Sequence, residues 1–261
     1  LVQLLRLLRR AGCGVTLVAW EQLAERADRE RYARALHEIG CEARELLPGA
    51  VAGQPWSWEL GGPRLRAVLD RSVFDAALVS FWNLAARAVP LLRQAAPDLR
   101  VVVHSWDVWH LREARGAALE GKLRHLQQVA SARHHELGAY ALADAVLVVT
   151  DQDRDVIAAG LRAEAAAGGL PSGRAEPPPA LTVTHTHPVA ADPPGWAERR
   201  DVVFVGYFVH PPNVDAALWL AREVWPRAAR KLPGARLLIA GGHVPDEVDR
   251  KSTRLNSSHR L

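Results

Sequence analysis

A chain of 261 residues is long enough for two domains that each bury a core. Hydrophobic residues make up 49% and charged residues 24%, which is typical of a globular protein in water. No apolar run approaches the roughly 20 residues of a membrane helix, which argues against a membrane-spanning protein. Cys13 and Cys41 are the only two cysteines and lie far apart, which excludes a disulfide framework or a CxxC pair and predicts a reducing cytoplasm.

The net charge of +4 comes from one end of the chain. Residues 250–261 hold four basic residues, Arg250, Lys251, Arg254 and Arg260, and no acidic one, so residues 1–249 carry no net charge. The net charge therefore gives little reason to expect a nucleic-acid partner. Residues 250–261 also differ in composition from the rest, and we expect them to be an artefactual tail outside the fold.

Hydrophobic periodicity predicts strands and helices in alternation. An amphipathic helix at 1–12 is followed by a strand (14–20), a helix (29–40) and a strand (41–47). A loop and a helix near 62–72 lead to a strand (74–81), a helix (83–98) and the valine-rich strand 99–106. A helical stretch over 108–143, broken near Gly116 and Gly121, precedes a strand (143–150), a short helix, a mobile loop (163–180) and a strand (181–189). Strand 201–206, helix 214–231 and a last strand close the pattern.

The alternation predicts an α/β fold with two Rossmann-like domains built on parallel sheets. Residues 1–190 form the first domain, the proline-rich residues 191–200 the linker, and residues 201–249 the start of the second domain. The chain has no methionine and its first element is a helix. We therefore expect that both domains are incomplete, the first without its opening strand.

Polar residues follow the buried strand 99–106 in the segment "HSWDVWHLRE". Asp107 and His110 are the candidate catalytic residues, because a carboxylate and an imidazole at the carboxyl end of a strand can orient a hydroxyl or stabilise developing charge. The alternative is that Asp107 caps the next helix and that His110 and Arg112 are solvated.

The segment "DVVFVGYFVHPPNVDAALW" places Gly206 at the carboxyl end of a strand, where open α/β sheets bind ligands. Pro211 and Pro212 precede the next helix, and Asn213 is expected as its N-cap. The helix N-terminus would offer N–H groups to an anion. Neither GxGxxG nor GxxxxGK[ST] is present, so phosphate binding and a plain strand–helix joint both stay open.

Three further features of the sequence bear on metal or sugar binding. "DQD" at 151–153 opens a helix, where acidic residues favour the helix dipole. His185 and His187 share one face of the expected strand but have no third ligand nearby, so no metal site is predicted. Four of the nine tryptophans, Trp56, Trp58, Trp106 and Trp109, lie in or beside expected loops, where they stack on sugars or fill a core.

The residues "FVGYFVHPPNVDA" resemble the start of the donor-binding domain in a bacterial branch of family 4 glycosyltransferases of the GT-B fold, which reads FVG-x-F-x-HPPN-x-DA. "VVVHSWDVWHLREAR" is similar to a D-x-x-H-x-x-R-E run of the same branch, and "ADAVLVVT" resembles the strand before the interdomain crossing. The resemblance covers about residues 1–248. It implies a cytoplasmic enzyme that moves a sugar from a nucleotide-diphosphate sugar to an acceptor hydroxyl, without a cofactor or metal.

The resemblance assigns the acceptor to the first domain and the donor to the second, with Gly206, His210 and Asn213 beside the diphosphate. The acceptor would be a glycan, a lipid-linked molecule or a small molecule, and a lipid-linked one would bring the protein to the inner face of the membrane. The chain departs from the family because no Arg or Lys lies between Gly206 and Arg222 and no E-x7-E region follows Arg222, where the family carries it. We therefore expect the chain as given to be inactive. The alternatives are a sugar-nucleotide epimerase of the same fold and a non-catalytic nucleotide- or sugar-binding fragment.

Overall fold

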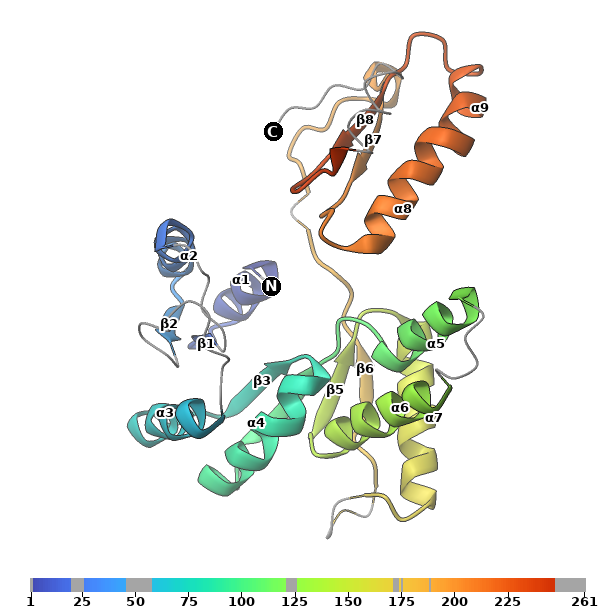
Figure 1. Cartoon of the computed structure of the whole chain (residues 1–261). Coiled ribbons are helices and arrows are strands. Elements are labelled where there is room, and N and C mark those ends of the chain that lie inside the picture. The colour runs from blue at the N-terminus through green and yellow to red at the C-terminus, as the bar shows by residue number, and fades with distance from the viewer. Residues whose placement is uncertain are drawn as a thin grey trace. The chain divides into compact units, whose positions relative to one another are not determined.

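The computed structural model describes residues 2–19, 26–45, 58–120, 126–170, 174, 176–187 and 189–246. It consists of two compact units, Leu1–Pro188 (the larger unit) and Val189–Leu261 (the smaller unit), which we describe separately (Figure 1). Residues 250–261, expected as an artefactual tail, lie outside the described residues. No helix within the described ranges has the length and hydrophobicity that a membrane crossing requires.

The larger unit alternates strands and helices as the periodicity predicts. Its elements are α1 (Val2–Arg10), β1 (Thr16–Ala19), α2 (Arg26–Glu38), β2 (Glu42–Glu45), α3 (Trp58–Arg71), β3 (Ala76–Ser80), α4 (Trp82–Ala95), β4 (Arg100–His104), α5 (Trp109–Glu120), α6 (Leu126–Ala141), β5 (Ala145–Val148), α7 (Asp151–Ala166) and β6 (Ala180–Thr182). Strands β1 and β2 form a parallel pair, and Val18 of β1 packs against the main core of the unit.

Strands β3, β4, β5 and β6 form a parallel sheet whose order follows the sequence. On one face the valines of β3, β4 and β5 are buried, and helices α4, α6 and α7 pack there (Figure 1). The buried valines are Val79, Val101, Val103, Val146 and Val148. Helix α7 approaches α6 closely, because a Cβ atom on Gly160 would lie 2.9 Å from Leu137. The sheet and these helices thus form the main core.

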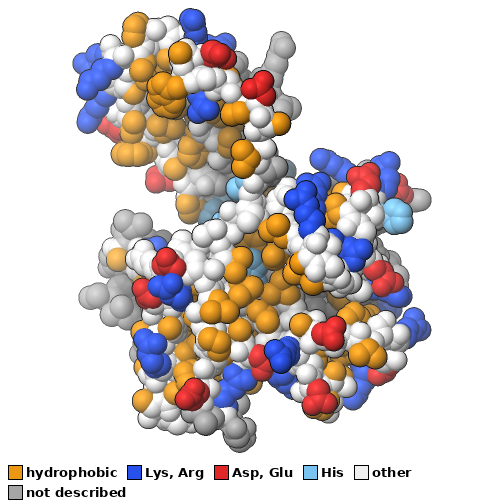
Figure 2. Space-filling model, turned by 180° about the vertical axis from the view of Figure 1, so that it is seen from behind, with side chains coloured by type: hydrophobic (Ala, Val, Ile, Leu, Met, Phe, Trp, Pro, Cys, Tyr) orange, Lys and Arg blue, Asp and Glu red, His pale blue; other side chains and the backbone are white. Residues whose placement is uncertain are grey.

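The opposite face of this sheet is less covered. Leu78 and Leu181, which point to that side, are 38% and 49% exposed, and Val102 and Leu147 are half-buried. Hydrophobic side chains gather on a surface of the larger unit in Figure 2. Among the described residues of β4, Val101 and Val103 are fully buried on one face, and Val102 on the other face is half-buried.

An ion-pair cluster fixes the amino-terminal end of the sheet. Asp144 accepts a hydrogen bond of 2.7 Å from the Val101 N–H and lies 2.8 Å from Arg93 and 3.3 Å from Arg174. Burial alone would raise the pKa of Asp144, but the hydrogen bonds from Arg93 and Val101 and the two guanidinium charges hold this pKa below its usual value. The cluster joins the start of β4 to the start of β5.

Two predicted boundaries in the larger unit are wrong. Helix α7 runs to Ala166, because the alanine-rich residues after Gly160 continue it until Gly168 adopts a φ of +76°. The loop expected from residue 163 therefore starts later. Strand β6 ends at Thr182, so His185 and His187 lie beyond the strand rather than on one of its faces.

The smaller unit contains η2 (Trp196–Glu198), β7 (Val202–Val205), α8 (Pro211–Trp219), the π-helical turn η3 (Leu220–Val224), α9 (Trp225–Ala229) and β8 (Leu237–Ala240). Strands β7 and β8 are parallel, and Leu237 and Ile239 are buried together with Trp225. The predicted helix 214–231 starts earlier, at Pro211, and is interrupted by η3 just before Pro226, which has no N–H for the helical ladder. Val203 and Val205 are 56% and 76% exposed.

Candidate functional site

An aromatic cluster lies after the carboxyl ends of β3 and β4. The Trp106 ring is 6.2 Å from Phe81, 4.7 Å from His104 and 5.2 Å from His185 between centroids. Phe81 is half-exposed and has a φ of +71°, which is rare for an aromatic residue. His185 belongs to the segment after β6, so three separate chain segments meet around Trp106.

Two polar atoms inside this cluster have no hydrogen-bond partner within the described part of the chain. They are Nδ1 of His104 and Nε1 of Trp106. Burial, and then the nearby charge of His185, lower the pKa of His104 below 6.5. His104 is therefore a neutral imidazole at neutral pH.

The stability of the larger unit is expected to rise with pH through the region below pH 6.5. The unfolded chain binds a proton at His104 in this range and the folded unit does not, so acidification favours unfolding. Urea unfolding at about pH 5 and about pH 7.5 measures the difference. The variant His104→Gln cannot titrate and should show a smaller difference, whereas an unchanged one would contradict the assignment.

A buried carboxylate organises the segment that carries Asp107 and His110. Glu136 of α6 is fully buried and accepts hydrogen bonds of 2.9 Å from the backbone N–H groups of Trp109 and His110. The His110 ring donates through Nδ1 at 2.7 Å, and the Tyr140 hydroxyl donates at 2.9 Å. Glu136 thus places a negative charge at the N-terminus of α5, where the helix dipole favours it.

The network continues from Tyr140 toward the end of β4. The Tyr140 hydroxyl lies 2.7 Å from Ser105 Oγ, which donates to the Asp107 carbonyl oxygen at 2.7 Å. Burial, and then the charge of Glu136, raise the pKa of the Tyr140 phenol far above its usual value. Tyr140 therefore stays protonated, and its single O–H donates to the Glu136 carboxylate.

The structure corrects the alternative roles considered for Asp107 and His110. Asp107 does not cap α5, because Glu136 takes the first N–H groups, and its carboxylate instead pairs with Arg112 at 2.7 Å. The His110 side chain is only 7% exposed, so it is not solvated. A carboxylate can only accept, so Nδ1 of His110 carries a proton, and Nε2 is the ring nitrogen that does not contact Glu136.

Sequence reasoning missed Glu136. It lies four residues before Tyr140 and three before Ala139, so helical periodicity places it on the buried face of α6. A glutamate on an otherwise apolar helix face was the feature of the sequence that could have indicated a buried carboxylate. Its partners follow β4 in the sequence and could not be inferred without the packing of α6 against α5.

In the smaller unit, Gly206 follows β7 and is closely surrounded. A Cβ atom there would lie 3.1 Å from Phe204, 3.3 Å from Asn213 and 3.4 Å from Phe208. The Gly206 N–H donates to the Ala240 carbonyl oxygen at 3.0 Å. Packing alone therefore explains glycine at this position, and contact with a diphosphate stays a prediction.

The expected N-cap role of Asn213 is wrong. Helix α8 begins at Pro211 with His210 as its N-cap, and the Asn213 side chain donates instead to the Tyr207 carbonyl oxygen at 2.9 Å. Prolines at the first two helical positions have no N–H, so a capping acceptor is not needed there.

The N-terminus of α8 therefore has no free N–H group for an anion. The His210 N–H bonds to Tyr207, the Asn213 N–H bonds to His210, and the two positions between them are prolines. An anion at this turn would have to be held by side chains. Besides His210 and Asn213, the exposed Tyr207 and His243 meet edge to face at 5.5 Å, which the sequence did not indicate.

The two acidic residues of "DQD" have a structural role at the start of a helix. Asp151 and Asp153 open α7, and Thr150 caps it by accepting from the Asp153 N–H at 3.1 Å. No group of three or more His, Cys, Asp or Glu side chains is arranged to hold a metal among the described residues. Trp56 lies outside the described residues.

Comparisons with known proteins address the fold. No protein-family model matches the chain, and no curated protein sequence matches it. Among solved structures, a UDP-glucosyltransferase from Polygonum tinctorium, capable of glucosylating indoxyl, aligns over 98% of this chain and 67% of its own, with 13% identity and a TM-score of 0.51. The chain has a GT-B type of fold.

MurG from Acinetobacter baumannii also aligns, over 99% of this chain and 60% of its own, with 11% identity and a TM-score of 0.43. The chain thus spans about two thirds or less of these GT-B proteins. The predicted α/β class with parallel sheets is confirmed. At identities this low, the structural likeness shows the fold alone. Membership of family 4 stays a proposal.

Proposed function

We propose that the chain is part of a family 4 glycosyltransferase that transfers a sugar from a nucleotide-diphosphate sugar to an acceptor hydroxyl. The observation that carries the proposal is the GT-B type of fold combined with "FVGYFVHPPNVDA" at the end of β7. The larger unit is the acceptor side, and the smaller unit is the donor side. The acceptor is a glycan, a lipid-linked molecule or a small molecule.

On the donor side, side chains rather than a helix N-terminus contact the nucleotide. Tyr207 offers an exposed ring for a base or sugar, and His210 and Asn213 follow it in the same turn. Gly206 lies at the end of β7 directly before this turn.

On the acceptor side, Asp107 and His110 contact the acceptor. Asp107 is oriented by Arg112, and its half-exposed carboxylate accepts a hydrogen bond from the acceptor hydroxyl. His110 is held through Nδ1 by Glu136, and Nε2 takes the proton that leaves during transfer. Departure of the diphosphate depends on electrostatic stabilisation, which the smaller unit supplies through His210.

Binding of UDP and GDP tests the donor side. In amide NMR spectra of the chain, we expect either nucleotide to shift the resonances of residues 206–213, with a Kd on the order of 1 mM, about −4 kcal/mol. His210→Ala should weaken binding about fivefold, through the loss of about 1 kcal/mol of hydrogen bonding. His134→Ala is the matched control, since this exposed histidine lies on α6 in the larger unit.

Shifts confined to other residues, or none with either nucleotide, would contradict the donor role of this turn. Binding without sugar transfer by the full-length gene product would identify a binding protein instead. A product with an epimerised sugar, formed without any acceptor, would identify an epimerase.

A further inference from the structure

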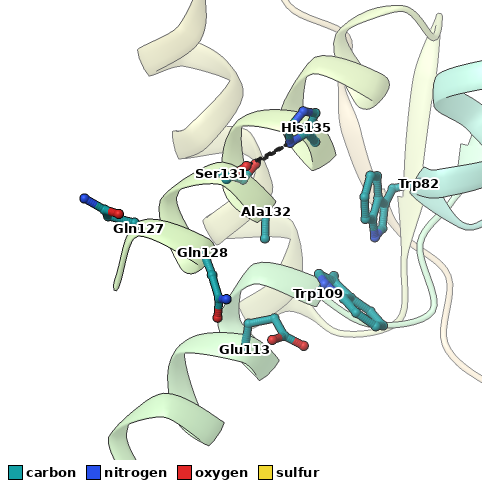
Figure 3. Close-up of a pocket in the computed structure, with 8 residues that line it drawn as sticks. All are labelled: Trp82, Trp109, Glu113, Gln127, Gln128, Ser131, Ala132 and His135. Atoms are coloured by element: carbon teal, nitrogen blue, oxygen red, sulfur yellow. Dashed lines mark hydrogen bonds between the residues drawn. The ribbon is translucent and has the colours of Figure 1, made fainter. Parts of the chain in front are cut away.

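A hollow of about 490 Å³ lies on the larger unit between the start of α4 and helices α5 and α6 (Figure 3). It is lined by Trp82, Trp109, Glu113, Gln127, Gln128, Ser131, Ala132 and His135. Neither Asp107 nor His110 is among these residues, so the hollow is separate from the groups assigned to sugar transfer.

Two tryptophans form one wall of the hollow. The rings of Trp82 and Trp109 are 6.4 Å apart between centroids and inclined at 56°. A ligand ring stacked between the two indoles would need about 3.5–4 Å on each side, which is more than their separation. No ring therefore fits between them. The inclined rings instead form a corner, in which a flat apolar surface rests on one indole and touches the edge of the other.

Trp109 is held in place before any ligand arrives. The Arg112 guanidinium lies 3.9 Å from the centre of its ring, and Asp107 fixes Arg112 at 2.7 Å. Arg112 does not line the hollow. A side chain fixed in this way loses little conformational entropy when a ligand binds.

Polar groups form the rest of the wall and decide which ligand fits. Glu113, Gln127, Gln128 and Ser131 line this part of the hollow. In Figure 3 the Gln127 side chain points away from the indoles, so the Glu113 carboxylate, the Gln128 amide and the Ser131 hydroxyl are the polar groups beside the hollow. The His135 ring bonds to the Ser131 carbonyl oxygen at 2.7 Å. Among the residues that the structure describes, no lysine or arginine lines the hollow, and the one charged lining group is a carboxylate. A phosphate or a uronate would be repelled there.

We propose that this hollow binds an uncharged pyranose ring of a carbohydrate. The C–H face of the ring packs on the indole corner, while its hydroxyl groups meet the Gln128 amide and the Glu113 carboxylate. A flat aromatic ligand would use the indoles and leave the polar wall unpaired, so the sugar is the better match. The inference rests on the hollow alone and does not require transfer activity.

The test uses the whole chain with cellobiose, maltose and glucose as neutral probes. Glucuronate is the anionic counterpart of glucose. We expect the indole N–H resonances of Trp82 and Trp109 to shift with at least one disaccharide, and glucuronate to bind at least about threefold more weakly than glucose. Trp109→Ala should weaken binding about fivefold or more through lost aromatic contact. Trp219→Ala removes an exposed tryptophan from the smaller unit and is the matched control.

Two variants keep the test independent of folding defects. Ala132 lies on the hollow's lining between the polar and aromatic walls, so Ala132→Phe fills the space without deleting a group (Figure 3). Gln128 is exposed, so Gln128→Ala leaves the core intact and should weaken binding about twofold to fivefold.

Unchanged binding by Ala132→Phe, tighter binding of glucuronate than of glucose, or no indole shift with either disaccharide would each overturn the proposal. Tight binding of an aromatic probe such as indole, without any disaccharide binding, would assign the hollow to aromatic ligands. These outcomes are independent of the UDP and GDP titrations.

Discussion

Replacing Glu136 by alanine is expected to lower the free energy of unfolding of the larger unit by about 3–5 kcal/mol. The substitution removes the acceptor of four hydrogen bonds, from two backbone N–H groups, the His110 ring and the Tyr140 hydroxyl. These donors lie in the interior, where water does not easily replace the carboxylate. Helix α5 also loses the negative charge at its N-terminus.

Urea unfolding followed by circular dichroism measures this change, with Glu113→Ala as the matched control. Glu113 is exposed on α5, so its removal should alter stability by no more than about 0.5 kcal/mol. Tyr140→Phe should cost about 1 kcal/mol, since it removes one donor of the same network. If Glu136→Ala lowered the free energy of unfolding no more than Glu113→Ala does, the conclusion that the buried network holds the segment of Asp107 and His110 would be wrong.

Replacing Gly241 by alanine is expected to destabilise the smaller unit by about 3 kcal/mol or more. A Cβ atom on Gly241 would lie 1.6 Å from the Gly206 carbonyl oxygen, so the ends of β7 and β8 would have to separate. The φ of Gly241 is +151°, a conformation that other residues rarely adopt. The core is too small to absorb such a shift.

The neighbouring glycine supplies the control for this prediction. A Cβ atom on Gly242 would meet Tyr207 at 3.5 Å, an ordinary contact distance, so Gly242→Ala should be tolerated. Hydrogen exchange of the amides of β7 and β8 reports on the smaller unit separately from the larger one. Equal protection in the two variants would show that the strands do not meet as closely at 206 and 241 as described.

Much of the fold follows from sequence pattern alone. The valine run at β4 and the apolar runs at β3 and β5 each become a parallel strand, because continuous apolar segments between helices suit a buried sheet. The apolar run at β7 also becomes a parallel strand, although Val203 and Val205 are exposed. Boundaries were less predictable. Proline chemistry moved the start of α8 to Pro211, and alanine propensity extended α7 to Ala166.

The candidate site was predictable only in part. Asp107 and His110 were selected because they follow a buried strand, but their partners depend on packing between helices. Glu136 and Trp82 come from segments separated from "HSWDVWHLRE" in the sequence, and no local pattern joins them to it. That the N-terminus of α8 has no free N–H group could be seen only from the hydrogen bonds of the structure.

The strand order of the larger sheet has a consequence for how the chain folds. Each of the strands β4, β5 and β6 pairs with the strand that precedes it in the sequence, across one or two helices. The loop-closure entropy of each pairing is therefore modest and similar, since it grows only slowly with loop length. During synthesis, every new strand finds its neighbour already made, so this sheet can grow one strand at a time without waiting for a distant segment.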